Sequence, residues 1–151
     1  MKILICSDCH GDYAALNQIY LSNSDVDIFY NLGDNELPEY LLHNFLAIKG
    51  NCDFNSLPLE ANTEVEGFKI HMEHGNNFLF HMNANKYIEN KDCDIFLFGH
   101  THKKLASKVG NTYVFNPGSL SRPRDGDKGS YLILELKENE PIKYEFKEVK
   151  E

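Results

Sequence analysis

Short apolar runs that end at glycine or at polar residues recur along much of the chain. Each run has the length and aliphatic content of a strand buried in an α/β sheet. These runs are Ile3–Cys6, Val26–Tyr30, Phe45–Lys49 and Asp94–Phe98. Apolar residues at helical spacing predict helices over Tyr13–Tyr20, Pro38–Asn44 and Asn83–Glu89. Asp12 is the expected N-cap of the first helix. This alternation of strands and helices predicts the α/β class.

The second half of the chain contains strands of a different kind. Glu64–Met72 alternates polar and apolar residues around Gly67, as a β-hairpin does. Further strands are expected at Leu105–Val109, Thr112–Phe115, Tyr131–Leu136 and Ile142–Val149. Arg122–Gly129 is rich in glycine, proline and charge, which predicts a surface loop. Since no repeat, linker or change of composition interrupts the chain, residues 1–151 are expected to form a single domain.

Composition narrows the classes of function. The chain has 151 residues, of which 42% are hydrophobic and 25% charged, as in a folded globular domain. Its net charge of −8 and its lack of a basic tract argue against a nucleic-acid surface. Its apolar runs are too short for a membrane span or a signal peptide, so we expect a cytoplasmic protein that does not enter a membrane. A homo-oligomer is compatible with the sequence.

The four cysteines do not make a convincing redox or zinc site. Cys6 and Cys9 form a C-x-x-C pair, which suits a redox site or half of a zinc site. Cys52 and Cys93 are isolated, so they do not supply a second pair. A thioredoxin-like pair opens a helix, whereas Cys6 falls within a predicted strand. We therefore favour packed thiols and keep a redox role for the pair as an alternative.

Polar residues of metal-binding type follow several of the predicted strands. Asp8 and His10 follow the first strand, and an extended backbone would point both side chains to one side. Seven such residues occur at strand ends, where ligands collect in α/β sheets: Asp8, His10, Asp34, Asn51, His74, His100 and His102. They outnumber the ligands of one tetrahedral zinc, which indicates two ions with Asp34 as the natural bridge. No ligand role is expected for His43, His71 or His81.

The same residues form a series of short motifs. The motifs are Asp8-Cys9-His10-Gly11, Gly33-Asp34, Gly50-Asn51-Cys52-Asp53, His74-Gly75 and Gly99-His100-Thr101-His102. In this order they resemble the five motifs of the calcineurin-like metallophosphoesterase superfamily, and most of all its small YfcE-like phosphodiesterase group. Asn116-Pro117-Gly118-Ser119 also follows the last motif in that family. The resemblance implies a four-layer αββα sandwich with a dinuclear site at the strand ends. It further implies that Asp8, His10 and His102 hold one ion and Asn51, His74 and His100 the other, with Asp34 bridging.

The chain departs from the family pattern at two positions. Most of the superfamily has a histidine at the position of Cys52, where it acts as the general acid and helps to hold the phosphate. A thiol with a pKa near 8.5 is a poorer proton donor near neutral pH than an imidazole near 6.5. Asp53 would normally orient that histidine, so Cys52 and Asp53 are the candidate catalytic residues with roles left open. The second departure is Asn76, which replaces a histidine of the fourth motif.

These observations predict a metal-dependent phosphoesterase, and more narrowly a phosphodiesterase, in which a metal-bound hydroxide attacks phosphorus. The expected cofactors are two divalent transition-metal ions, manganese first and nickel, iron or zinc as alternatives. Two such ions and two aspartates give a core of about +2, which lets an acidic protein take a small phosphoester substrate. The alternative is a non-catalytic interaction scaffold like the retromer subunit of this superfamily, whose metal ligands are eroded. All seven positions here carry competent ligands, which favours the hydrolase.

Overall fold

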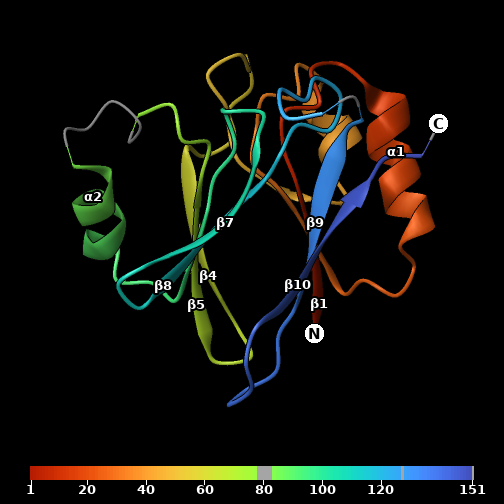
Figure 1. Cartoon of the computed structure of the whole chain (residues 1–151). Coiled ribbons are helices and arrows are strands. Elements are labelled where there is room, and N and C mark those ends of the chain that lie inside the picture. The colour runs from red at the N-terminus through yellow and green to blue at the C-terminus, as the bar shows by residue number, and fades with distance from the viewer. Residues whose placement is uncertain (78–82, 127, 151) are drawn as a thin grey trace.

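Two five-stranded sheets form the centre of the fold in the computed structural model, which describes residues 1–77, 83–126 and 128–150 (Figure 1). The first sheet has the order β10-β9-β1-β2-β3, with β1 at Lys2–Cys6, β2 at Ile28–Asn31, β3 at Leu46–Ala47, β9 at Ser130–Glu135 and β10 at Lys143–Glu148. The second has the order β4-β5-β6-β8-β7, with β4 at Glu60–Val65, β5 at Phe68–Glu73, β6 at Ile95–Leu97, β7 at Lys104–Val109 and β8 at Thr112–Pro117.

Alternating side chains on the central strands create the layers. Ile3 and Ile5 of β1 point into the core between the sheets, where they join Leu97 and other apolar residues of the second sheet. Leu4 lies on the opposite face of β1, in a second cluster that contains the buried side of helix α1, Tyr13–Ser22. Phe96 likewise lies on the outer face of β6, beneath helix α2, Ala84–Asn90. The expected four-layer αββα sandwich is therefore confirmed.

Strand direction determines where the site can form. β1, β2 and β3 are parallel to one another, and so are β5, β6 and β8. The carboxyl ends of parallel neighbours meet at one edge of each sheet. The N-terminus lies at the lower end of β1 in Figure 1, so the carboxyl end of that strand faces the loops at the upper rim. Segments that follow these strands, and that are far apart in the sequence, therefore meet at one rim.

Both helices begin at the positions that their sequences indicate. The Asp12 side chain accepts a hydrogen bond from the Ala15 amide at 3.0 Å, which confirms Asp12 as the N-cap of α1. Asn83 caps α2 in the same way by accepting from the Lys86 amide at 3.0 Å. No helix among the described residues is both long and apolar enough to cross a membrane.

The region between β2 and β4 departs from the sequence-based prediction. The helix expected over Pro38–Asn44 is only a 3₁₀ turn, η1, at Glu39–Leu42, because the Leu41 amide bonds back three residues to the Pro38 carbonyl. The strand expected over Phe45–Lys49 is reduced to β3, because the Lys49 amide bonds to the Pro58 carbonyl outside the sheet. Apolar content alone does not reveal either alternative hydrogen-bond partner.

Further along the chain, the predicted hairpin needs adjustment and the predicted loop does not. The hairpin expected over Glu64–Met72 is longer, because β4 and β5 pair from Glu60 to Glu73 around the turn at Glu66–Gly67. The predicted surface loop Arg122–Gly129 contains no helix or strand among its described residues, and residue 127 lies outside the description.

A matched pair of leucines tests the packing between the sheets. Leu97 is fully buried in the central core, whereas Leu21 on α1 is 67% exposed. We expect Leu97→Ala to lower the free energy of unfolding by about 2–5 kcal/mol, because it removes buried contacts and leaves a cavity. Leu21→Ala should change it by less than about 0.5 kcal/mol. Chemical denaturation of both variants measures the difference, and equal effects would contradict this assignment of the core.

Candidate metal centre

The rim of the sandwich gathers donor side chains into two clusters. Within each cluster the donor atoms all lie within 4.8 Å of one another. One cluster is Asp8, His10 and His102, and the other is Asp34, His74 and His100. Asn51 lies beside the second cluster, with its Oδ1 3.1 Å from His100 Nδ1. All seven residues singled out from the sequence therefore lie at one place, and their role as ligands remains a prediction.

The two clusters adjoin each other through the Asp8 carboxylate. Asp8 Oδ1 lies 3.3 Å from His102 Nε2 and 3.7 Å from His10 Nε2 within its own cluster. The same oxygen lies 3.7 Å from His74 Nε2 of the other cluster. His74 Nε2 is in turn 3.0 Å from Asp34 Oδ2. The donors therefore surround one shared centre.

The backbone at these residues is not extended. The expectation that an extended backbone points the Asp8 and His10 side chains to one side was therefore wrong. The first strand ends at Cys6, and Asp8 and His10 have φ of 56° and 44°. Five of the seven residues occupy this left-handed region, which side chains other than glycine adopt at a cost: Asp8, His10, Asp34, His100 and His102. Tight turns, rather than strand alternation, therefore make these side chains converge.

Hydrogen bonds between loops hold those turns in place. The Asp8 amide donates to the Gly33 carbonyl and the His10 amide to the Asp34 carbonyl, each at 3.0 Å. The His100 amide and the Ser7 hydroxyl both donate to Asp8 Oδ2, at 3.0 Å and 2.6 Å. A Cβ atom on Gly99 would collide with the Ser7 hydroxyl and the Asp8 carboxylate, so this close approach requires glycine.

Three of the imidazoles are oriented by a partner on the nitrogen that faces away from the centre. His10 Nδ1 lies 2.6 Å from Glu36 Oε1. His74 Nδ1 lies 2.8 Å from the Leu32 carbonyl oxygen, and His102 Nδ1 lies 2.7 Å from that of Arg122. Such partners fix the tautomer and leave Nε2 as the coordinating atom in histidine metal sites. This is the arrangement that ligand histidines require.

Two buried atoms at the centre lack a well-aligned hydrogen bond. Within the described part of the chain these are Asp8 Oδ1 and His74 Nε2, although His102 Nε2 lies 3.3 Å from the first and Asp34 Oδ2 lies 3.0 Å from the second. A buried carboxylate oxygen without a donor costs free energy unless a cation compensates its charge. The mixture of imidazole, carboxylate and amide donors matches divalent transition metals. The residues present therefore fit a metal centre.

The ionisation of the clusters shows how strongly the groups interact. Burial by itself would raise the pKa of Asp34, but the neighbouring His74 lowers it overall. Burial also opposes a charge on His74, yet Asp34 and Asp8 raise its pKa above the ordinary value. Burial and the charge of His74 together lower the pKa of His100. Since the carboxylates favour a proton on His74, a metal ion must compete with that proton.

The two candidate catalytic residues differ in where their side chains lie. The Asp53 carboxylate accepts from four backbone amides, those of Asp34, Asn35, Glu36 and Gly50, at 2.8–2.9 Å. It thus joins two loops, and both of its oxygens are engaged by backbone amides in a buried position, which favours a positioning role. Cys52 lines the cavity at the clusters, and burial together with Asp34 raises the pKa of its thiol.

The remaining histidines lie apart from this centre. His43 is exposed, and its Nδ1 lies 2.8 Å from the Tyr40 carbonyl oxygen. His71 is buried with both ring nitrogens in hydrogen-bond contact, to Asn62 and Glu73, although with Glu60 and Glu73 it forms a third group of metal-type donors. The expectation that His71 has no ligand role therefore stays a prediction. His81, also expected to have none, lies outside the described residues.

The Cys6 and Cys9 pair has the properties of packed thiols. Both are free and buried, and Cys9 Sγ lies 3.2 Å from Asn35 Oδ1. Burial raises the pKa of Cys9 to about 12. A redox thiol needs an accessible thiolate near neutral pH, so this environment opposes the redox alternative.

Sequence reasoning missed three residues of the site. Glu36 orients His10, while Arg122 and Arg124 line a cavity of about 440 Å³ together with the donor side chains. Arg122 and Arg124 fell in a segment predicted only as a surface loop. They are the only two arginines of the chain, and that scarcity was the available signal.

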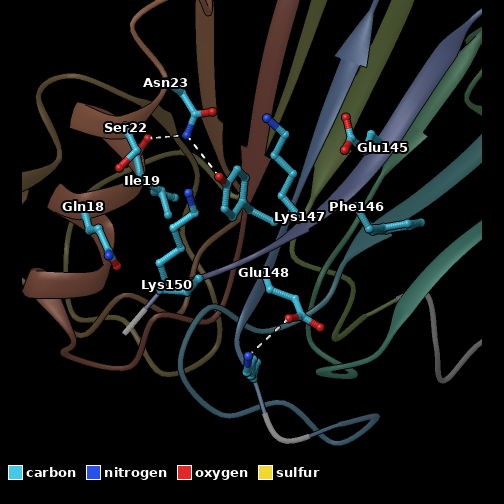
Figure 2. Close-up of a pocket in the computed structure, with 12 residues that line it drawn as sticks. Gln18, Ile19, Ser22, Asn23, Glu145, Phe146, Lys147, Glu148 and Lys150 are labelled. Carbon is cyan, nitrogen blue, oxygen red and sulfur yellow. Dashed lines mark hydrogen bonds and ion pairs between the residues drawn. The ribbon is translucent and has the colours of Figure 1, made fainter.

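A larger cavity, of about 680 Å³, lies elsewhere, between α1 and the last strand, β10 (Figure 2). Lysines and glutamates of β10 and its flanks line it, as do Asn23 and Tyr131, and the Asn23 amide donates to the Tyr131 hydroxyl at 3.2 Å. None of the seven predicted ligands contributes to it. Volume alone therefore does not locate the chemistry, and we place the functional site at the donor clusters.

Several known proteins are similar to this chain. Phosphodiesterase YfcE from Escherichia coli K12 is 28% identical over 169 residues, covering 89% of this chain and 88% of the relative. The crystal structure of a predicted phosphoesterase from Streptococcus pneumoniae TIGR4 superposes with a TM-score of 0.85 at 29% identity, covering 96% of this chain and 87% of that one.

A further structural likeness concerns the fold alone. Vps29 from Entamoeba histolytica, solved with Zn²⁺, has a TM-score of 0.76 at 23% identity and covers 99% of this chain and 100% of that one. The calcineurin-like phosphoesterase superfamily domain matches residues 1–139, most of the chain and every residue of the two donor clusters. The chain therefore belongs to the calcineurin-like phosphoesterase superfamily.

Proposed function

We propose that the protein is a metal-dependent phosphodiesterase that hydrolyses small phosphoesters at a dinuclear centre. The observation that carries the proposal is the convergence of two His/Asp clusters around buried donor atoms that lack a well-aligned hydrogen bond. The likeness to phosphodiesterase YfcE supports the reaction class. Clusters that keep every donor favour catalysis over the scaffold alternative, because a scaffold does not need them.

Each cluster would hold one divalent ion, with Asn51 completing the second set and Asp34 between the two. The donor set suits manganese, and it also suits nickel, iron or zinc. When bound, a pair of divalent ions stabilises the charge that develops on phosphate oxygens and makes water a better nucleophile. The Glu36 carboxylate and the backbone carbonyls of Leu32 and Arg122 contact three imidazoles. They keep these rings in the orientation that metal coordination needs.

Cys52 restricts the esters that the protein can hydrolyse. Its thiol lies at the cavity with a raised pKa, so it remains protonated near neutral pH and is not a nucleophile. A thiol is also a weak proton donor to a departing alkoxide. We infer that esters with good leaving groups, such as aryl phosphodiesters, react fastest and that alkyl monoesters react hardly at all.

A matched pair of histidines tests the site. We expect His102→Ala to remove one metal ion per chain and to reduce diester hydrolysis by more than roughly 100-fold, because it deletes a donor from the first cluster. His43→Ala should leave both quantities unchanged, since that imidazole is exposed and contacts only Tyr40. After reconstitution with manganese, metal analysis should find two ions in the parent, and bis(p-nitrophenyl) phosphate reports the rate. Equal losses in both variants would mean that the site is misplaced.

Leaving-group dependence tests the role of Cys52. For the parent, the rate on a series of aryl and alkyl phosphodiesters should fall steeply as the leaving-group pKa rises, because no strong proton donor is present. Cys52→His should flatten that slope and raise the rate on the poorest leaving groups by up to roughly 100-fold. Cys52→Ser is the control and should keep the steep slope. A flat dependence in the parent would show that another residue supplies the proton.

A further inference from the structure

The only two arginines of the chain both line the cavity at the donor clusters. Arg122 and Arg124 share its wall with His10, His102 and Cys52 among others. All other basic residues of the chain are lysines. The guanidinium group is planar and offers paired donors that match two oxygens of a phosphate, which an ammonium does not. The chain therefore has this type of anion-binding side chain only at the proposed active site.

The backbone of the two arginines is anchored to the site. The Arg122 amide donates to the Ser119 hydroxyl at 2.8 Å, and the Arg122 carbonyl accepts from His102 Nδ1 at 2.7 Å. The Arg124 amide donates to the His102 carbonyl at 2.9 Å. The charge of Arg124 also acts on His102, where it opposes the rise in pKa that Asp8 causes. The arginines are thus placed by the same contacts that orient a predicted ligand.

The side chains of the two arginines are not neutralised by the protein. Within the described residues, neither guanidinium has a carboxylate within ion-pair distance, although the chain has 23 acidic residues. The adjacent Asp125 carboxylate is engaged elsewhere, because it accepts from the Lys104 amide at 2.6 Å and lies 3.9 Å from Lys104 Nζ. Arg122 and Arg124 therefore remain available to a ligand.

The charge at the cavity exceeds what a simple diester can balance. Two divalent ions held by Asp8 and Asp34 give a core of about +2. Arg122 and Arg124 add two positive charges beside that core. A phosphodiester carries one negative charge, so it leaves most of this charge uncompensated, and both arginines are exposed to a ligand. A ligand with a second phosphate would balance it.

We propose that Arg122 and Arg124 bind a second phosphate group of the substrate. This inference rests on the proposed function and narrows it: the preferred substrate is a phosphodiester that carries a further phosphate on one of its substituents. The metal centre takes the scissile phosphate, and the arginine pair takes the second. The arginines act as binding and specificity residues, with no part in proton transfer.

Binding of two probes that differ by one phosphate tests the proposal. The probes are adenosine 3′,5′-bisphosphate and adenosine 5′-monophosphate, titrated into the manganese-loaded full chain by calorimetry. The parent should bind the bisphosphate at least about tenfold more tightly. Arg122→Ala and Arg124→Ala should each lower the affinity for the bisphosphate by roughly tenfold. Each should change the affinity for the monophosphate by less than about threefold. Arg122→Lys should recover only part of the loss, because lysine lacks the paired donors.

Lys103→Ala is the matched control. It removes one exposed positive charge next to His102 in the sequence, but Lys103 does not line the cavity. It should change the affinity for neither probe by more than about twofold, because Lys103 lies outside the cavity lining that contains both arginines. If Lys103→Ala lowered the affinity for the bisphosphate as much as the arginine variants do, the loss would come from the overall positive charge of the region. The proposal would then be wrong. Equal binding of the two probes by the parent would also overturn it.

Two measurements separate this inference from the proposed function. Metal content and bis(p-nitrophenyl) phosphate hydrolysis by the parent report on the donor clusters, whereas the preference for the bisphosphate over the monophosphate reports on the arginines. A parent that holds metal and hydrolyses the diester, together with arginine variants whose probe preference is unchanged, would refute the arginine site and leave the hydrolase in place. A parent that holds no metal and hydrolyses no diester, yet prefers the bisphosphate through the arginines, would refute the hydrolase and support the anion site.

Discussion

The burial of the Asp8 carboxylate is the constraint on which the rest of the site depends. The side chain is fully buried, and one of its oxygens accepts from the Ser7 hydroxyl and the His100 amide, while the other makes no well-aligned hydrogen bond and faces His102 Nε2 at 3.3 Å. An uncompensated carboxylate in such a place would destabilise the fold by several kcal/mol. The imidazoles of His10, His74 and His102 approach the free oxygen from three loops. A cation bound at these donors would compensate the buried charge, which would couple occupation of the proposed site to the stability of the rim.

The left-handed backbone of the ligand residues follows from the same requirement. Side chains from five loops reach one point only if the chain turns sharply after each strand, and such turns cost about 1–3 kcal/mol each at residues other than glycine. Backbone bonds such as those from the Asp8 and His10 amides to the next loop offset part of that cost. Asp53 contributes most visibly, since its carboxylate collects four amides of two loops. Asp53, which the sequence suggested as a catalytic residue, instead fixes the loops that carry the predicted ligands.

Much of this architecture could be predicted from the sequence, and the omissions have physical reasons. Alternating apolar residues such as Ile3, Leu4 and Ile5 determine which side chains face the sheet interface and which face a helix, so the layers followed from periodicity. The motifs located the seven donors because metal-binding side chains follow strand ends. Periodicity carries no information on nonlocal partners, so the Lys49–Pro58 bond that shortens β3 was missed. Arg122 and Arg124 were missed for the same reason, because their place in the cavity depends on bonds to His102.

The overall charge of the protein and the charge of the site act on different length scales. A net charge of −8 opposes the approach of an anion, but ionic screening limits that repulsion to about 8 Å at physiological salt. Within the cavity the distances between charges are short, so the local charge determines binding. Among the described residues, no carboxylate pairs with the two arginines there, while the neighbouring Asp125 is engaged by Lys104. An acidic chain can thus present two arginines at one cavity, and its net charge is compatible with a phosphorylated small molecule as ligand.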